Sequence, residues 1–405
     1  MRKINTGDFT PANRTTPQTI NRQIVLNLVR EHQPISRADL ARRMNIGRGM
    51  VTSFVSRLID EGTIYEGDTV DTPRGRKPRM LHVRTRDRLA IAIDVRFSRS
   101  YVVLSDFAGV HIATESFDTP ADPPALVAEL ASRVNRMVSN YAADGSCEGI
   151  GIVVPGMVDQ RDGRVLNAPQ LGWRDVHIRD VLADATGLPV HIENAPIACA
   201  IAQMWLGERG ADAGDFAYVT VSDGVGVGVV VNGQVLRGHG FTAGEFGHVP
   251  IHPEGERCLC GARGCWEAYT SNLATLSRYL GVELAGPDTR RALRRSGLTL
   301  AELISRARNG DARAADAIRE TGHNLGLGLA MLVNGLNPAR IFVGGEITAA
   351  WDMIEGCIRS AIQDRALSRD AAATPIIPEQ AGAQPRLRGA TALVAAPLFA
   401  APRVG

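Results

Sequence analysis

Residues 244–267 contain two short motifs, Gly244-Glu245-Phe246-Gly247-His248 and Cys258-Leu259-Cys260-Gly261-Ala262-Arg263-Gly264-Cys265-Trp266-Glu267. One histidine and three cysteines can close a tetrahedral zinc site, and soft thiolates favour zinc over magnesium or calcium. The predicted ligands are His248, Cys258, Cys260 and Cys265, with His252 as an alternative nitrogen ligand. Because four protein ligands fill the coordination sphere, the zinc would be structural and would fix a glycine-rich loop.

The composition excludes several classes of protein. A chain of 405 residues can form two or three domains with separate cores. No apolar run approaches the roughly 18 residues that a membrane span needs. The first residues, Met1 to Asn5, lack the apolar segment of a signal peptide, and three of the six cysteines crowd together as in a cytosolic metal site. We therefore expect a cytoplasmic protein with no membrane partner.

The charge is unevenly distributed along the chain. The net charge is only +2, but residues 1–88 hold 17 Lys and Arg against 9 Asp and Glu. The first 88 residues are therefore basic and the remainder is acidic. This asymmetry favours an N-terminal module that binds a polyanion.

Helical periodicity predicts three helices in the basic part, over residues 17–31, 37–44 and 48–61. The expected inward-facing residues are Ile20, Ile24, Leu28 and Val29, then Leu40 and Met44, then Val51, Phe54, Val55 and Leu58. Ser36 is predicted as an N-cap with Asp39 as its capping acid, and residues 45–47 as a tight turn. Two helices joined by such a turn are typical of a helix-turn-helix.

The outer face of the third helix is small and polar, so the helix could lie close in a major groove. Strands expected over residues 63–66 and 80–83 would form a wing around the basic loop 73–79, which could enter the minor groove. The predicted contacts to double-stranded operator DNA are Ser36, Arg37, Arg48, Thr52, Ser53, Arg57, Arg76 and Arg79. A plain basic linker is the alternative for the loop, and a three-helix protein-interaction module is the alternative for the whole segment.

The acidic part alternates apolar strand-like runs with helical stretches, which is typical of α/β proteins. The predicted strands are residues 89–95, 149–154, 216–221, 226–231 and 340–343. The predicted helices are residues 124–141, 196–206, 301–308 and 312–334.

The chain resembles the ROK family of repressors, open reading frames and sugar kinases over about residues 17–400. Besides the zinc segment, the matching motifs are Gly149 to Ile152 with Pro155-Gly156, Leu188-Pro189-Val190 with Glu193-Asn194, Gly344-Gly345-Glu346-Ile347 and Ser36 to Leu40. The resemblance implies a winged helix-turn-helix followed by a two-lobed, actin-like (ribonuclease H-like, sugar-kinase-type) ATPase-fold domain. It implies a DNA-binding domain over 1–85 and lobes over 86–205 and 206–405. The last helix could pack back on the first lobe, and a homodimer or homotetramer is expected.

The family's kinases hold their sugar with an Asn, a catalytic Asp, the Glu and His of the first motif and the Glu after the last Cys. These positions correspond to Asn194, Ala195, Glu245, His248 and Glu267. Such a set of carboxylates and an amide can pair with ring hydroxyls and discriminate among sugars. The resemblance therefore implies ligand binding by Asn194, Glu245, His248 and Glu267.

Two departures from the kinase pattern indicate that the chain is not an enzyme. Ala195 stands where the general base belongs, and loss of a general base typically slows a reaction about 10²–10⁴-fold. Glu193 ends a strand and would point away. The kinases' Asp-x-Gly-Gly-Thr phosphate loop is Asp94 to Ser98 here, with Phe97 in place of a glycine. We therefore do not expect ATP as a cofactor. The second glycine-rich loop of the kinases is kept at residues 222–228, and a tight hairpin is the alternative interpretation of it.

These observations predict a repressor of carbohydrate uptake or catabolism genes, controlled by a sugar or sugar-derivative effector. A ROK sugar kinase and a DNA-binding protein with a ligand-free pocket are the alternatives. Because Ala195 removes one polar arm of the pocket, His191 and Trp173 are candidates to compensate.

Overall fold

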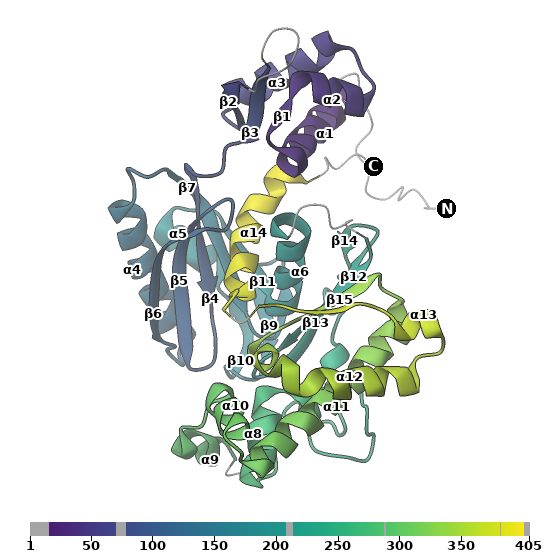
Figure 1. Ribbon diagram of the computed structural model, residues 1–405. Coiled ribbons are helices and arrows are strands. Elements are labelled where there is room, and N and C mark those ends of the chain that lie inside the picture. Colours follow the sequence, from purple (N-terminus) through teal and green to yellow (C-terminus); the bar gives the residue numbers. More distant parts are fainter. Residues whose placement is uncertain (1–15, 70–77, 208–213, 287–288, 381, 401–405) are drawn as a thin grey trace.

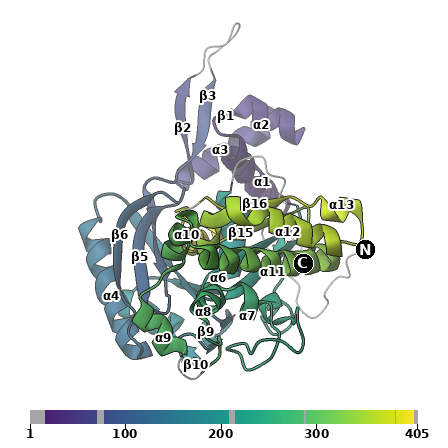
Figure 2. The same cartoon turned by 60° about the horizontal axis from the view of Figure 1, so that its bottom comes forward.

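The computed structural model describes residues 16–69, 78–207, 214–286, 289–380 and 382–400 (Figure 1). The chain forms a small N-terminal head, residues 16–83, on a body of two α/β lobes (Figures 1 and 2). Within the described residues, none of the helices is long and apolar enough to cross a lipid bilayer.

The head is a winged helix-turn-helix. Its elements are α1 (Thr16–His32), β1 (Ile35–Ser36), α2 (Arg37–Met44), α3 (Arg48–Asp60), β2 (Ile64–Thr69) and β3 (Arg79–Val83), with an antiparallel sheet in the order β1-β3-β2. The predicted start of α2 is confirmed, because Ser36 and Asp39 form a reciprocal capping box. The predicted turn is confirmed as well, since Asn45 ends α2 in the left-handed conformation at φ 53°.

The inner face of α3 is as predicted, whereas that of α1 is rotated. Val51, Phe54, Val55 and Leu58 are buried, as is Leu40. In α1 the buried residues are Val25, Leu26 and Val29, and Ile24 is 42% exposed. Apolar residues occupy two overlapping stripes of this helix, and contact with the other head helices and with the body decides which stripe is buried.

The first lobe contains a five-stranded sheet in the order β11-β7-β4-β5-β6. Its strands are β4 (Arg88–Asp94), β5 (Arg99–Asp106), β6 (His111–Asp118), β7 (Ser146–Val154) and β11 (Val190–Asn194), and a small sheet holds β8 (Met157–Asp159), β9 (Arg164–Ala168) and β10 (Trp173–His177). Helices α4 (Pro123–Asn140) and α5 (Arg179–Thr186) pack on the face that carries Ile91 and Ile93. The opposite face of β4 carries Ala90 and Ala92, whose small side chains let helices approach closely.

The second lobe contains the sheet β14-β13-β12-β15-β16. Its strands are β12 (Phe216–Val221), β13 (Val225–Val231), β14 (Gln234–Val235), β15 (Arg340–Gly344) and β16 (Ile376–Pro378). Its helices are η1 (Phe246–His248), α7 (Glu267–Thr270), α8 (Asn272–Leu280), α9 (Thr289–Ser296), α10 (Leu300–Arg308), α11 (Ala312–Leu336), η2 (Glu346–Ala350), α12 (Trp351–Arg365) and α13 (Arg369–Ala372). The long helix α11 packs against α12 and the sheet around the largest apolar core.

Two helices join the lobes and reach the head. Helix α6 (Ala195–Leu206) contacts β11 and β7 of the first lobe as well as β12 and β13 of the second lobe. Helix α14 (Pro385–Phe399) packs along α6 and on β4 and β7, and its last residues lie against α1 (Figure 1). Gly151 lies under α14, and a Cβ there would lie 1.8 Å from the carbonyl oxygen of Ala390. The head therefore rests on the ends of the two helices that lie between the lobes.

Candidate ligand and metal site

One histidine and three cysteines of the second lobe converge. One donor atom from each of His248, Cys258, Cys260 and Cys265 lies within 4.8 Å of the other three. The Sγ atoms of Cys260 and Cys265 are 3.7 Å apart, and His248 Nδ1 lies 3.9 Å from Cys258 Sγ. Tetrahedral zinc with Zn–S bonds of about 2.3 Å separates sulfur ligands by about 3.8 Å. The cluster therefore has the spacing of a four-ligand metal site.

Tight turns bring the cysteines together. Gly264 has φ 74°, and a Cβ at this position would lie 1.9 Å from the carbonyl oxygen of His252, so a side chain is excluded. The neighbouring Trp266 is fully buried and donates from Nε1 to the carbonyl of Asn324 in α11 (2.9 Å). The indole thereby fixes the cysteine segment to the core of the second lobe.

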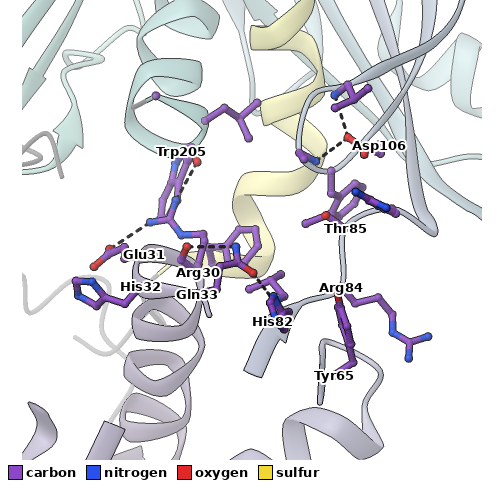
Figure 3. Close-up of a pocket in the computed structure, with 18 of the residues that line it drawn as sticks. Arg30, Glu31, His32, Gln33, Tyr65, His82, Arg84, Thr85, Asp106 and Trp205 are labelled. Carbon is purple, nitrogen blue, oxygen red and sulfur yellow. Dashed lines mark hydrogen bonds and ion pairs between the residues drawn. The ribbon is translucent and has the colours of Figure 1, made fainter. Parts of the chain in front are cut away.

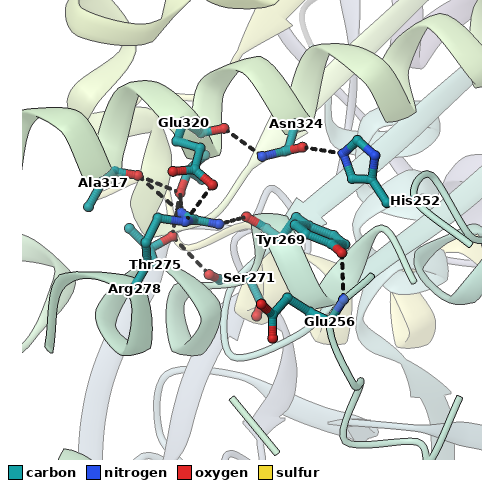
Figure 4. Close-up of polar contacts among 10 residues, drawn as sticks. His252, Glu256, Tyr269, Ser271, Thr275, Arg278, Ala317, Glu320 and Asn324 are labelled. Carbon is teal, nitrogen blue, oxygen red and sulfur yellow. Dashed lines mark hydrogen bonds and ion pairs between the residues drawn. The ribbon is translucent and has the colours of Figure 1, made fainter. Parts of the chain in front are cut away.

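His252 lies outside this cluster. Its Nε2 lies 3.3 Å from Asn324 Oδ1 (Figure 4). Its ring packs edge-to-face with Tyr269, with the two ring centroids 4.8 Å apart. Asn324 is itself held by the carbonyl of Glu320, and Tyr269 accepts a hydrogen bond from Arg278 at its carbonyl. The geometry therefore favours His248 over His252 as the nitrogen ligand.

A cavity of about 140 Å³ lies between the lobes beside the cluster. The residues at the predicted ligand positions all line it, namely Asn194, Ala195, Glu245, His248 and Glu267. They come from the start of α6, from η1 and the residue before it, and from the start of α7. Gln170, which sequence reasoning missed, also lines the cavity, and no motif marks it. His191 and Trp173 do not line it: Trp173 is buried in the core of the first lobe. The suggestion that these two residues compensate for Ala195 was therefore wrong.

The metal cluster and the cavity share side chains. His248 turns Nδ1 toward Cys258, while its Nε2 lies 3.9 Å from Glu245 Oε2. Glu267 accepts from the backbone N–H of Val225 (2.9 Å) and from Cys258 Sγ (3.6 Å). Burial raises the pKa of both the Glu245 and the Glu267 carboxyl, because removal from water disfavours their charged forms. Groups of this kind are suited to hydrogen bonding with a neutral polyhydroxylated ligand.

Asn194 caps a helix and also lines the cavity. Its Oδ1 accepts from the N–H of Ile197 (3.1 Å) and so caps α6. Glu193 is buried beneath it, where Gln160 and Arg237 donate to its carboxylate, and it does not line the cavity. Glu193 therefore does not supply the carboxylate that the kinases have at the position of Ala195.

Ion pairs line the side of the cavity formed by Arg96, Arg386 and Glu346. Buried Asp94 accepts from Arg96 Nε (2.7 Å) and from Arg386 Nε (2.7 Å), and Arg96 also reaches Glu346 of the second lobe (3.1 Å). Burial and the carboxylate of Glu346 raise the pKa of Asp223 nearby. The prediction of an altered loop relied on Phe97, but Arg96 also occupies a glycine position of the kinase motif.

The second glycine-rich loop is a hairpin. Residues 222–224 connect antiparallel β12 and β13, and Ser222 N–H donates to the carbonyl of Gly224 (2.9 Å). Gly226 and Gly228 lie against Pro196 at the start of α6, where side chains would collide. These glycines therefore serve the packing of α6 on the second lobe.

The predicted DNA contacts are distributed over α3 and the wing. Arg48, Thr52, Ser53 and Arg57 are exposed on one face of α3. Arg37 and Arg79 both pair with Glu66 of β2, and Arg76 lies outside the described residues. Ser36 is only 4% exposed and its hydroxyl is bonded to Asp39, so its place in the contact set requires correction: it caps α2.

Comparison with known families identifies both parts of the chain. The model of the ROK family matches residues 90–396. The chain belongs to the ROK family. A winged helix-turn-helix DNA-binding model matches residues 18–65, which cover α1, α2 and α3. The fold class expected from the sequence is therefore confirmed.

Relatives that this ROK protein matches over most of its length include transcriptional regulators. The xylose repressor of Bacillus subtilis is 26% identical over 95% of this chain and 97% of the relative. The DNA-binding transcriptional dual regulator NagC of Escherichia coli is 27% identical over 88% of each chain. A solved ROK transcriptional regulator, a homologue of the E. coli MLC protein, superposes with a TM-score of 0.77 at 26% identity, covering 95% and 97% of the two chains.

A solved kinase of the family matches a smaller share of the chain. The ROK glucokinase from Streptomyces griseus, solved with glucose and AMPPNP, has a TM-score of 0.64 at 28% identity and covers 75% of this chain and 98% of the kinase. The regulator structure thus matches 95% of the chain and the kinase structure 75%. The chain is a DNA-binding transcriptional repressor of the ROK family.

Proposed function

We propose that this ROK repressor controls genes of carbohydrate uptake or catabolism and that its effector is a sugar or sugar derivative bound between the lobes. The observation that carries the proposal is the convergence of Asn194, Glu245, His248 and Glu267 on one cavity. Hydrogen-bonding groups that line a cavity discriminate strongly among hydroxylated ligands. The chain would divide into a DNA-binding domain over 1–85 and lobes over 86–205 and 206–405.

The same site is not suited to phosphoryl transfer. Ala195 has no group that can take a proton from a sugar hydroxyl. Arg96 and Arg386 neutralise Asp94 and occupy the side of the cavity where a glycine-rich loop would admit phosphates. Asp223 and Glu346 line the cavity as well and add carboxyl groups there rather than donors that could bind phosphate. The body is therefore proposed to bind a ligand without catalysis and without ATP.

Zinc is the proposed metal of the cluster. One imidazole nitrogen and three thiolates are a preferred ligand set for zinc, and four protein ligands leave no position open for catalysis. His248, Cys258, Cys260 and Cys265 would hold the ion. When bound, the ion would supply a fixed cross-link that orients His248 and Glu267 toward the ligand. This role is structural.

The proposed control is allosteric. A ligand that contacts both lobes changes their relative position, and it shifts operator binding by its differential affinity for the two arrangements. In a homodimer or homotetramer, paired heads must match half-sites about 34 Å, one helical turn, or a multiple of it apart. The proposed DNA contacts are Arg37, Arg48, Thr52, Ser53, Arg57, Arg76 and Arg79.

The first test is a pull-down of genomic fragments from the source organism by the purified protein, with and without a panel of sugars. The panel includes D-xylose and N-acetyl-D-glucosamine, which the names of the relatives suggest. We expect enrichment of a palindromic site near carbohydrate genes, altered by one member of the panel. No enrichment above an Arg48→Ala/Arg57→Ala variant would refute DNA reading by α3.

Glu245→Gln is expected to lower the affinity for the effector sugar about 10- to 100-fold without changing the thermal stability of the protein. The substitution keeps the shape of the side chain but removes a charged hydrogen-bond acceptor, and such bonds contribute about 1.5–3 kcal/mol. Isothermal titration would measure the affinity. Glu254→Gln, at an exposed position in the same segment, is the matched control. Equal affinity in the two variants would argue against a ligand contact at Glu245.

No sugar-dependent ADP release is expected from the wild-type protein, and Ala195→Asp alone is not expected to restore it. The added carboxylate supplies a base but leaves the ion pairs around Asp94 in place. A coupled assay across the sugar panel, with a ROK glucokinase as positive control, measures turnover. Sugar-dependent turnover by the wild-type chain would overturn the non-enzymatic proposal.

A further inference from the structure

The head contacts the body through a small, defined joint. We define the joint as Arg30 of α1, Trp205 of α6 and Phe399 of α14. The Arg30 guanidinium lies 4.9 Å from the Trp205 ring centroid and 5.3 Å from the Phe399 ring centroid. The centroids of the two rings are 6.3 Å apart, and their planes are inclined by 28°. Planar guanidinium groups stack favourably on aromatic faces, and more strongly when they are shielded from water.

The joint also provides a hydrogen-bond donor for a carbonyl at the C-terminal end of α6. The last carbonyls of a helix have no partner within the helix and carry partial negative charge. Arg30 Nη1 donates to the carbonyl of Trp205 (2.9 Å), and Arg388 of α14 donates to the carbonyl of Leu206 (2.6 Å). One of these two C-terminal partners thus belongs to the head. A shift of α6 changes the geometry of this bond directly.

Two further bonds attach α1 to the end of α14. Gln23 Nε2 donates to the carbonyl of Leu398 (2.8 Å), and Asn27 Nδ2 donates to the carbonyl of Phe399 (2.9 Å). Phe399 is buried in the same apolar core as the head helices. Beside these contacts lies a cavity of about 1280 Å³ between head and body, next to Arg30 and Trp205 (Figure 3). The open space leaves room for the head to reorient on the joint.

The opposite end of α6 lies in the ligand cavity. Asn194 lines the cavity and caps the first turn, and Ala195 lines the cavity as well. Twelve residues at about 1.5 Å each make α6 a rod of about 18 Å. Because α6 packs on strands of both lobes, a change in the relative position of the lobes displaces it against at least one of them. The helix therefore joins the ligand cavity to the joint.

We infer that α6 transmits the state of the ligand cavity to the DNA-binding head through the joint of Arg30, Trp205 and Phe399, an inference that rests on the proposed function. Loss of the Arg30 contact uncouples the two sites while both remain able to bind. By thermodynamic reciprocity, operator DNA then no longer changes the affinity for the sugar.

The first arm of the test compares wild type, Arg30→Met and Arg22→Met in the full chain. Arg22 lies on the same helix, but its guanidinium pairs with Glu61 within the head, which makes it a matched control. Operator affinity is measured with and without D-xylose or N-acetyl-D-glucosamine. We expect wild type and Arg22→Met to respond by the same factor, in the range of about 5- to 150-fold that is typical of allosteric coupling. Arg30→Met should keep its operator affinity but respond less than about twofold. A full response by Arg30→Met overturns the inference.

The second arm needs no sugar. Hydrogen exchange of the ligand-free variants should show faster exchange in the last turns of α6 and α14 for Arg30→Met but not for Arg22→Met. Trp205→Leu should resemble Arg30→Met, and the double variant should add little, because both remove one interaction. If neither sugar changes operator binding by the wild type, the proposed effector control fails. The joint is then judged by exchange alone, and unchanged exchange in Arg30→Met overturns it.

Discussion

Chelation of the metal is expected to lower the melting temperature of this repressor by on the order of 10 °C and to abolish its response to sugar. Four side chains of a glycine-rich segment converge on the metal position, and removal of the ion lets the cysteines take up protons and breaks the cross-link that holds the segment. His248 and Glu267 belong both to this segment and to the ligand cavity, so loss of the ion disturbs both properties. Calorimetry, elemental analysis and sugar titration measure the effect.

Cys258→Ser should reproduce the effect of chelation, because a serine hydroxyl is a poor ligand for zinc. Cys357→Ser is the control, since Cys357 lies in α12 and outside the cluster. Metal content should fall only in Cys258→Ser. An unchanged melting temperature and sugar affinity after complete removal of the metal would contradict a structural role.

Ser53→Glu is expected to weaken operator binding by at least about 100-fold while leaving the fold intact. Ser53 is exposed on the outer face of α3, and a carboxylate there meets phosphate charge, at a cost of several kcal/mol. Glu is also compatible with an exposed helical position. Fluorescence anisotropy with the operator measures the loss, and circular dichroism verifies the fold.

Ser132→Glu provides the matched control for this substitution. Ser132 is exposed on α4 of the first lobe, so the same change of charge is made far from the head. Its operator affinity should differ from wild type by less than about twofold. Equal, unchanged binding by both variants would mean that α3 does not face the DNA.

Local patterns predicted the head well. The capping box at Ser36, the turn at Asn45 and the buried stripe of α3 depend on residues within a few positions of one another. The orientation of α1 did not follow from periodicity, because its apolar residues fit two faces and contacts with other parts of the chain bury Val25, Leu26 and Val29. Ser36 was predicted to contact DNA, yet its hydroxyl is engaged in the cap.

The sequence predicted the ligand-binding residues on one side of the cavity but not the ion pairs on the other side. Asn194, Glu245, His248 and Glu267 could be named because their motifs resemble those of the family's kinases, and they line one cavity. Arg96 could have been noticed at a glycine position. Its pairing with Glu346, 250 residues away, could not have been noticed, because that contact depends on how the lobes close.

The sequence by itself determined which residues form the helix-turn-helix and which four could bind a metal, because turns, caps and ligand spacing are local properties of the chain. Only the tertiary structure decided which partners these elements meet. Arg30 lies 175 residues from Trp205 in the chain, and their contact exists because α6 and α14 both end beneath the head. Such contacts depend on the packing of distant apolar surfaces, which is non-directional and leaves no pattern in any short stretch of sequence.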